Sequence, residues 1–142
     1  CDIFLDNNFT KEEMKLMWET NKILDQNIQV MATCVRVPVY NGHSEAIFFR
    51  LSEELSREEI IEILEKTPGL KVLDDPSEGV YPTPVENAVD TEEVYVGRIR
   101  SQYFDDKCWI SMWIVADNVY GKGAALNAVQ ICEQLLGIGS LE

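Results

Sequence analysis

Apolar and polar residues along this chain follow two different periods, and each change of period marks a predicted element. Residues Thr10–Glu13 form a capping box, in which threonine and a glutamate three positions later each accept a bond from the other's backbone amide. Apolar residues at helical spacing follow directly. We therefore expect a helix over about residues 11–25, with a buried stripe formed by Met14, Met17, Trp18 and Leu24.

Two further helices are predicted by the same signals. Residues Ser56–Glu59 form a second capping box, and the helix behind it should end near Thr67-Pro68-Gly69. Gly123 is expected to open the last helix and Gly137 to end it. The buried stripe of that last helix is predicted to contain Ala124, Ala125, Ala128, Val129, Cys132, Leu135 and Leu136.

Period-two alternation and β-branched residues predict strands between the helices. The predicted strands are residues 29–40, 44–51, 70–73, 94–100 and 108–116. We expect the first two to pair as a hairpin through the turn at Asn41-Gly42 and around His43. The last strand is apolar on both faces and is predicted to be central. Residues 74–90 read as a loop, and loops of that length are often functional.

The order of elements predicts the fold class. Helices and strands do not alternate as regular βαβ units, which favours an α+β domain with a mixed or antiparallel sheet and helices on one face. The 142 residues, 46% of them hydrophobic, suffice for one domain. Only 12 basic residues stand against 25 acidic ones, so the net charge of −13 argues against nucleic-acid or anionic-membrane partners. No apolar run approaches the roughly 20 residues of a membrane span.

The cysteines argue against a metal or redox centre. None of the four belongs to a CxxC pair, so the sequence supports neither a zinc site nor a redox dithiol. Cys34, Cys108 and Cys132 lie within apolar runs and are predicted to be buried thiols. This pattern predicts a reducing, cytoplasmic setting.

Few side chains in this sequence are candidates for catalysis or ligand binding, and the two clearest ones each have two interpretations. The single histidine, His43, is either an exposed structural residue or a general base near neutral pH. Arg36 either pairs with a surface acid or presents its planar fork to a ligand carboxylate. Glu12 and Lys15 are neighbours on one helix face, which is typical of a solvated ion pair. No glycine-rich nucleotide motif is present.

The order of several motifs gives the chain a family resemblance. Residues 10–15 read TKEEMK and residues 19–24 read ETNKIL; residues 32–39 read ATCVRVPV and residues 42–46 read GHSEA. Further matches follow at residues 96–100, 116–118 and 123–130. With these motifs in this order, the chain resembles the C-terminal domain of the aspartate-semialdehyde dehydrogenases over about residues 2–137.

The resemblance implies a reaction and a set of roles. The family reduces aspartyl phosphate to aspartate semialdehyde with NADPH, through a thioester on a cysteine. By motif position, His43 would be the general acid/base and Arg36 would hold the substrate carboxylate. Glu12 would bind the amino end of the substrate, Lys15 its phosphate, and Asn118 the nicotinamide part of the cofactor.

The resemblance also sets expectations for the whole chain. Residues 1–138 would be a substrate-binding and dimerisation domain like that of glyceraldehyde-3-phosphate dehydrogenase. Residues 139–142 are interpreted separately, from the Leu-Glu ending, as a tail that includes vector residues. The nucleophilic cysteine and the Rossmann fold that binds most of the NADP would belong to a part absent from this chain. We therefore expect an inactive homodimer cut from a longer enzyme.

Two alternatives remain open at the level of sequence. The first is a stand-alone dimerisation or binding module that kept the fold without the chemistry. The second is a domain of the related N-acetyl-glutamyl-phosphate reductase type, although the signature from Arg36 to His43 favours the aspartate branch.

Overall fold

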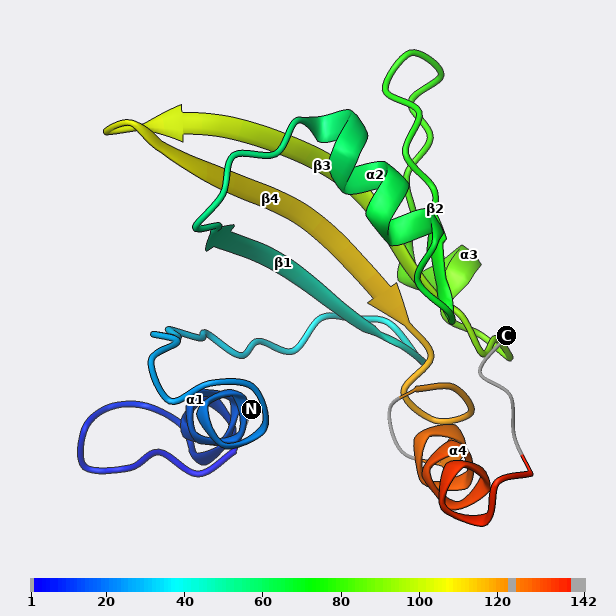
Figure 1. Ribbon diagram of the computed structural model, residues 1–142. Helices are drawn as coiled ribbons and strands as arrows, with labels where there is room; N and C mark the ends of the chain where they lie inside the picture. Colours follow the sequence, from blue (N-terminus) through cyan, green and yellow to red (C-terminus); the bar gives the residue numbers. More distant parts are fainter. Residues whose placement is uncertain (1, 123–124, 139–142) are drawn as a thin grey trace. The chain divides into compact units, whose positions relative to one another are not determined.

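A computed structural model describes residues 2–122 and 125–138 (Figure 1). The chain divides into two compact units, residues 1–38 and residues 39–142, and each is described by itself. Within the described residues, no helix has the length and apolar character needed to cross a bilayer.

The first unit is built around α1 (Lys11–Ile23). Its capping box is formed as predicted, since Glu13 N donates to Thr10 Oγ1 at 3.2 Å and Thr10 N donates to Glu13 Oε2 at 2.7 Å. The predicted apolar stripe is confirmed only in part. Met14 and Met17 are half-buried, whereas Trp18 and Leu24 are exposed. A stripe is buried only where another element faces it, and the rest of this unit is an irregular chain.

The predicted strand over residues 29–40 is wrong, and so is its hairpin with the next strand. The structure describes all of these residues and places none of them in a strand. Alternation indicates an extended backbone, but a strand also needs a partner for its amides. Pro38 supplies no amide, and the amide of Cys34 donates to the side chain of Glu13 instead.

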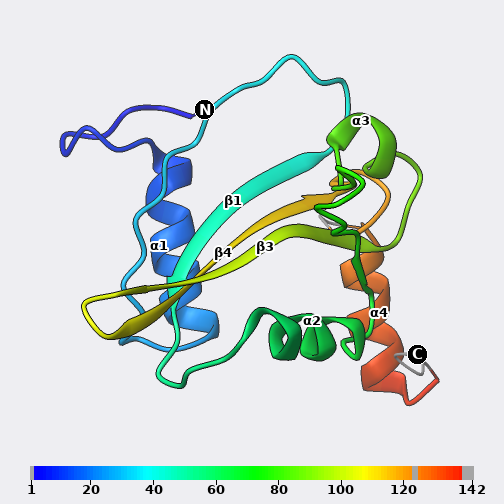
Figure 2. The same ribbon diagram turned by 90° about the horizontal axis from the view of Figure 1, so that it is seen from above.

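The second unit contains a four-stranded mixed sheet in the order β1-β4-β3-β2. Figure 2 shows β4 between β1 and β3. β4 pairs antiparallel with both β1 and β3, and β2 pairs parallel with β3. The predicted central position of the last strand is therefore confirmed. The bounds are β1 (His43–Arg50), β2 (Leu70–Val72), β3 (Val94–Phe104) and β4 (Lys107–Ala116).

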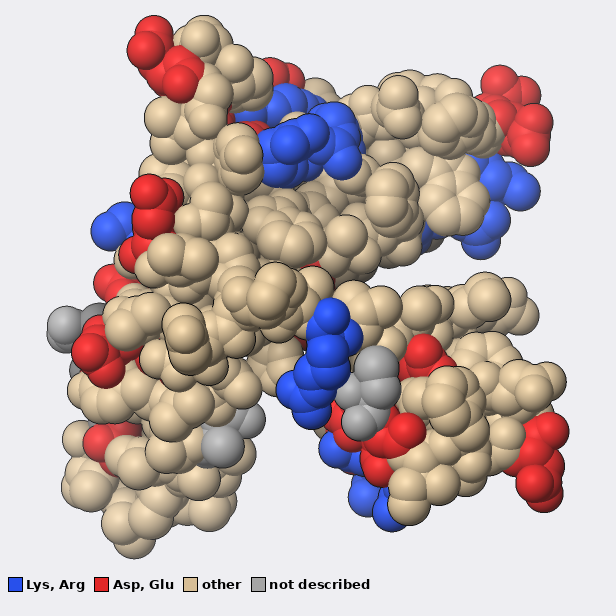
Figure 3. Space-filling model, turned by 180° about the vertical axis from the view of Figure 1, so that it is seen from behind, with Lys and Arg blue, Asp and Glu red and all other residues tan. Residues whose placement is uncertain are grey.

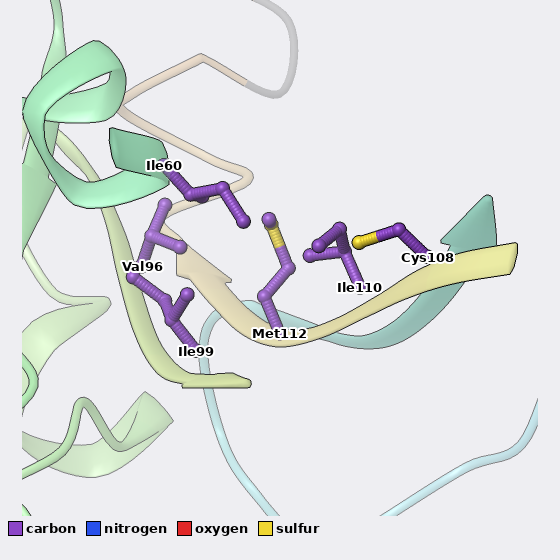
Figure 4. Packing of buried hydrophobic residues seen from close by; sticks show 6 residues of the cluster. All are labelled: Ile60, Val96, Ile99, Cys108, Ile110 and Met112. Carbon is purple, nitrogen blue, oxygen red and sulfur yellow. The ribbon is translucent and has the colours of Figure 1, made fainter. Parts of the chain in front are cut away.

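The core lies between this sheet and α2 (Arg57–Glu65), which is opened by its predicted capping box. Side chains from α2, β3 and β4 point toward one another there (Figure 4). Burying each large apolar side chain contributes about 1.5–3 kcal/mol, so this cluster anchors the unit. Its buried members are Ile60, Val96, Ile99, Cys108, Ile110 and Met112.

The loop predicted over residues 74–90 is partly ordered by local structure. It contains the short α3 (Pro84–Asn87), which the sequence pattern did not predict and which packs against β4. The indole Nε1 of Trp113 donates to the carbonyl of Pro82 at 3.0 Å and ties this loop to the sheet. The mixed α+β architecture predicted from the sequence is confirmed.

The last helix is α4 (Ala125–Leu136), and its predicted buried stripe is not found. None of its described residues is buried, and Leu135 is 83% exposed. Gly123 and Ala124, predicted to begin this helix and its stripe, lie outside the described residues. The prediction of buried thiols holds for Cys108 alone, because Cys34 is half-buried and Cys132 is exposed on α4.

Candidate functional site

His43 is the first residue of β1, and the backbone around it is fixed from two sides. Its strand position is opposite Ala116, the last residue of β4. The preceding amide, Gly42 N, donates to Asn118 Oδ1 at 3.1 Å. The structure therefore brings two predicted site residues, His43 and Asn118, to the same end of the sheet. The imidazole is exposed there and accessible to a reacting group.

The residue between Ala116 and Asn118 is a buried carboxylate. Asp117 is only 3% exposed. Its Oδ1 accepts from Val119 N at 2.8 Å and Tyr120 N at 2.9 Å, and its Oδ2 accepts from Asp90 N at 2.8 Å. The bond from the Tyr120 amide, with those from Val119 and Asp90, stabilises the charged form and lowers the pKa of Asp117.

In the first unit, Glu12 and Lys15 lie together on α1 as the spacing predicted. Lys15 Nζ is 3.4 Å from Glu12 Oε2, and the two side chains are 46% and 45% exposed. A pair of this kind on a helix surface is worth only about 0.2–0.5 kcal/mol. Each side chain can therefore leave the pair and bind a ligand group of opposite charge at a small cost in free energy.

The neighbouring Glu13 has a structural role that Glu12 lacks. It is buried, and besides bonding Thr10 N it accepts from Cys34 N through Oε1 at 2.8 Å. The bonds from the Thr10 amide and then the Cys34 amide lower the pKa of Glu13. Glu13 thus ties α1 to the segment that carries Arg36.

Arg36 is exposed two residues beyond this anchor. Among the described residues of the first unit, no carboxylate forms an ion pair with it. Its fork is thus accessible to a carboxylate from outside that unit. The predicted site residues fall into two groups, with Glu12, Lys15 and Arg36 in the first unit and His43 and Asn118 in the second.

Sequence reasoning missed three residues that hold these groups in place. They are Glu13, which binds the Cys34 amide, Asp117, which binds three amides, and Gly42, whose φ of +95° suits glycine. A signal existed for each. Glu13 completes the capping box, Asn41-Gly42 marks a turn, and an aspartate at the end of a strand commonly caps the turn that follows.

The comparisons with known proteins decide the family. A family model described as "Semialdehyde dehydrogenase, dimerisation domain" matches residues 2–120. The chain belongs to this family. The match begins before α1 and ends in the loop after β4, so it includes both groups of predicted site residues.

Individual relatives agree with this membership. The chain is 50% identical over 135 residues to an aspartate-semialdehyde dehydrogenase of Legionella pneumophila, with 94% of this chain and 38% of the relative covered. It is 49% identical over 139 residues to the enzyme of the same name from Aquifex aeolicus, covering 97% of the chain and 40% of the relative. The chain thus spans about two-fifths of the length of these relatives, and corresponds to their C-terminal part.

Solved structures confirm the fold. The crystal structure of aspartate semialdehyde dehydrogenase II from Vibrio cholerae, complexed with ASA, superposes with a TM-score of 0.88 at 43% identity. That alignment covers 96% of this chain and 40% of the Vibrio chain. The enzyme from Candida albicans, solved with NADP, superposes with a TM-score of 0.74 at 29% identity, over 94% of this chain and 45% of the Candida chain. The predicted likeness to the C-terminal domain of glyceraldehyde-3-phosphate dehydrogenase is confirmed at the level of fold.

Proposed function

We propose that this chain acts as the C-terminal substrate-binding and dimerisation domain of an oxidoreductase that reduces aspartyl phosphate to aspartate semialdehyde with NADPH. The observation that carries the proposal is the exposed imidazole of His43, whose backbone is held at the start of β1 by β4 and by Asn118. A proton-transfer group must be accessible and carried by a well-placed backbone, and His43 meets both conditions.

His43 is the proposed general acid/base. An imidazole exchanges protons near neutral pH, so His43 can take the proton from a cysteine thiol and return a proton to the reacting oxygen. That thiol belongs, in this proposal, to the part of the enzyme outside this chain. Cys34 is not proposed for it, because its amide is bonded to Glu13 and it lies within the motif that carries Arg36.

The charged residues of the first unit suit the substrate. Aspartyl phosphate carries a carboxylate, an ammonium and an acyl phosphate. The guanidinium of Arg36 can bind the carboxylate with two parallel bonds. Lys15 can bind the phosphate and Glu12 the ammonium, and on α1 both lie half-exposed within one turn of each other.

NADP, which the Candida albicans relative carries, also fits the residues of this chain. The Oδ1 of Asn118 accepts from Gly42 N, which fixes the direction of the amide and leaves its NH2 group as a donor. Such a donor suits the carboxamide oxygen of a nicotinamide. When bound, the cofactor supplies the hydride, and we propose that the part of the enzyme outside this chain holds most of it.

We also propose that the domain forms a homodimer through the sheet face opposite α2. Aromatic side chains stand exposed on that face, with Phe48 at 71%, Phe104 at 57% and Trp109 at 37%. They surround a shallow hollow that also contains Arg100 and Ser111. Seen from behind, much of the surface carries neither acidic nor basic side chains (Figure 3). Exposed aromatics of this kind typically mark a protein interface.

The setting proposed for this domain is the cytoplasm. Cys108 and Cys132 form no disulfide with one another in the described structure. Thiols kept apart in this way suit a reducing compartment.

A chimera tests the proposed function. In the Legionella pneumophila relative, the 135-residue match is replaced by the corresponding residues of this chain. We expect the chimera to reduce NADP when supplied with aspartate semialdehyde and phosphate, and this chain alone to be inactive. The His43→Ala chimera should lose about 10²–10⁴-fold in kcat, which is the usual contribution of a general acid or base.

Three outcomes would contradict the proposal. One is a folded, dimeric chimera without activity beside an active parent enzyme. Another is activity of the 142-residue chain on its own. The third is a preference of the chimera for N-acetyl-glutamyl phosphate over aspartyl phosphate, which would favour the related reductase.

A further inference from the structure

We propose that Asp117 is a positioning residue for His43, acting through Asn118 and the turn at Gly42. This inference rests on the proposed function, in which His43 moves protons. Its basis is a chain of contacts that lies entirely within residues 39–138 and links one buried carboxylate to the backbone next to the imidazole.

Asp117 joins two loops that are far apart in the sequence. Its Oδ1 accepts from the amides of Val119 and Tyr120 in its own loop, and its Oδ2 accepts from the amide of Asp90 in the segment before β3. The packing around this carboxylate is close. A Cβ on Gly121 would lie 2.5 Å from the carbonyl oxygen of Thr91 and 2.9 Å from that of Asp117. The loop after β4 and the segment around Asp90 are therefore fixed relative to each other.

Each of these loops contacts the turn that precedes His43. From one side, Asn118 follows Asp117 directly and accepts from Gly42 N at 3.1 Å. From the other side, Ala88 lies two residues before Asp90 and is fully buried. A Cβ on Gly42 would meet the Cβ of Ala88 at 2.5 Å, so the turn is pressed against that residue. Asp117 thus fixes the two loops that contact Gly42, one through Asn118 and the other through Ala88.

A carboxylate suits this place better than its closest isostere. Both oxygens of an aspartate accept, so one side chain can satisfy amides on two loops. An asparagine would direct its NH2 group toward an amide N–H, which leaves a buried donor unpaired. The Asp117→Asn variant therefore keeps the volume of the side chain but removes one of the two connections. We expect the turn at Gly42, and with it the backbone that carries the imidazole of His43, to lose its fixed position.

The first arm of the test observes His43 directly. The 142-residue chain contains one histidine, so its imidazole gives one carbon-bound ring signal set in an NMR spectrum. Asp117→Asn should shift, broaden or split these signals. The matched control is Asp75→Asn, because Asp75 also caps a turn, with Oδ1 accepting from Ser77 N at 2.9 Å and Glu78 N at 3.2 Å. The control should leave the His43 signals unchanged.

The second arm measures catalysis in the chimera. A misplacement of about 1 Å can cost on the order of 100-fold in rate, so Asp117→Asn should lower kcat by about 10- to 100-fold. The KM for aspartate semialdehyde should change little, since the proposed substrate-binding residues Arg36, Glu12 and Lys15 lie outside this chain of contacts. A His43→Ala, Asp117→Asn double variant should be no slower than His43→Ala, because residues that act as a unit are not additive.

Asn118 supplies variants that keep the proposal testable if Asp117→Asn does not fold. Asn118→Asp retains an acceptor for Gly42 N, whereas Asn118→Ala removes it. Both variants lose the NH2 group proposed for the nicotinamide, so a difference between them reports on the bond to Gly42. We expect a higher kcat in Asn118→Asp than in Asn118→Ala, and His43 signals closer to those of the parent. Equal losses of kcat in both variants, with undisturbed His43 signals, would overturn the inference.

The two proposals fail in different ways. If His43→Ala retains activity, the proposed role of His43 is wrong, while the NMR arm still decides whether Asp117 positions it. If His43→Ala is inactive but folded Asp117→Asn keeps its kcat within about twofold and its His43 signals unchanged, the positioning role alone is wrong. A slower Asp117→Asn whose loss adds in full to that of His43→Ala would also contradict it.

Discussion

Asp74 accepts bonds from Arg57 and from two amides at the bulge in β3, and its removal tests the energetics of this fold. Its Oδ1 accepts from Arg98 N at 2.7 Å, and its Oδ2 accepts from Ile99 N at 3.1 Å and from Arg57 Nη2 at 2.7 Å. These bonds lie at the bulge in β3, where Arg98 has a φ of +55° and the register with β4 shifts. The carboxylate replaces the strand partners that the bulge removes.

We expect Asp74→Ala to lower the free energy of unfolding by about 3–5 kcal/mol, as is typical when one partner of a buried ion pair is removed. The side chain of Asp74 is only 2% exposed, so solvent does not readily replace it. The amide of the buried Ile99 would also lose its acceptor, and an unpaired buried donor costs about 1–3 kcal/mol, which favours the upper part of this range.

The matched control is Glu62→Ala on α2. Lys66 Nζ lies 2.7 Å from Glu62 Oε1, the same separation as in the Arg57–Asp74 pair. Both members of the control pair are exposed, at 72% and 65%, so its loss should cost only about 0.3–0.5 kcal/mol. The two ion pairs thus have the same separation between nitrogen and oxygen and differ in how deeply they are buried.

The assay is urea unfolding of the chain in a Trp18→Phe background. The remaining tryptophans, Trp109 and Trp113, both lie in β4, so their fluorescence reports on the second unit. Equal destabilisation by Asp74→Ala and Glu62→Ala, within about 0.5 kcal/mol, would refute the argument that burial and the backbone bonds make the difference.

Two further predictions concern the turn at Gly42 and the dimer. Gly42→Ala should destabilise the chain by more than Gly79→Ala in thermal unfolding, because both have positive φ but only the first would bring a Cβ within 2.5 Å of Ala88; equal losses would contradict the close packing. Phe48→Asp should convert a dimer to a monomer in sedimentation velocity, while Val85→Asp, at a similarly exposed site, should not; an unchanged dimer would exclude this sheet face.

The candidate site was largely accessible to sequence reasoning, since its chemistry belongs to single residues in recognisable motifs. Arg36 and His43 stand out by residue type, whereas the roles expected for Glu12, Lys15 and Asn118 came from the family resemblance. The residues that hold the site were not accessible in the same way. The partners of Asp117 include the amide of Asp90, which is 27 residues away in the sequence. No local sequence pattern predicts such a bond.

Local signals determined where α1 and α2 begin. The capping boxes at Thr10 and Ser56 begin α1 and α2 as predicted, because each box involves only residues three apart in the chain. The apolar character of residues 108–116 likewise placed β4 inside the sheet, since a strand that is buried on both faces has little polar surface.

Only the tertiary structure decided which segments pair and which surfaces are covered. Residues 29–40 alternate like a strand yet join no sheet, and β1 pairs with β4, whose partner residues lie 59 to 73 positions further along the chain. The apolar stripe of α4 has the right spacing for burial but is exposed on the described chain. Spacing determines which face of an element is apolar, whereas pairing and burial require a second element, whose position depends on the packing of the whole unit.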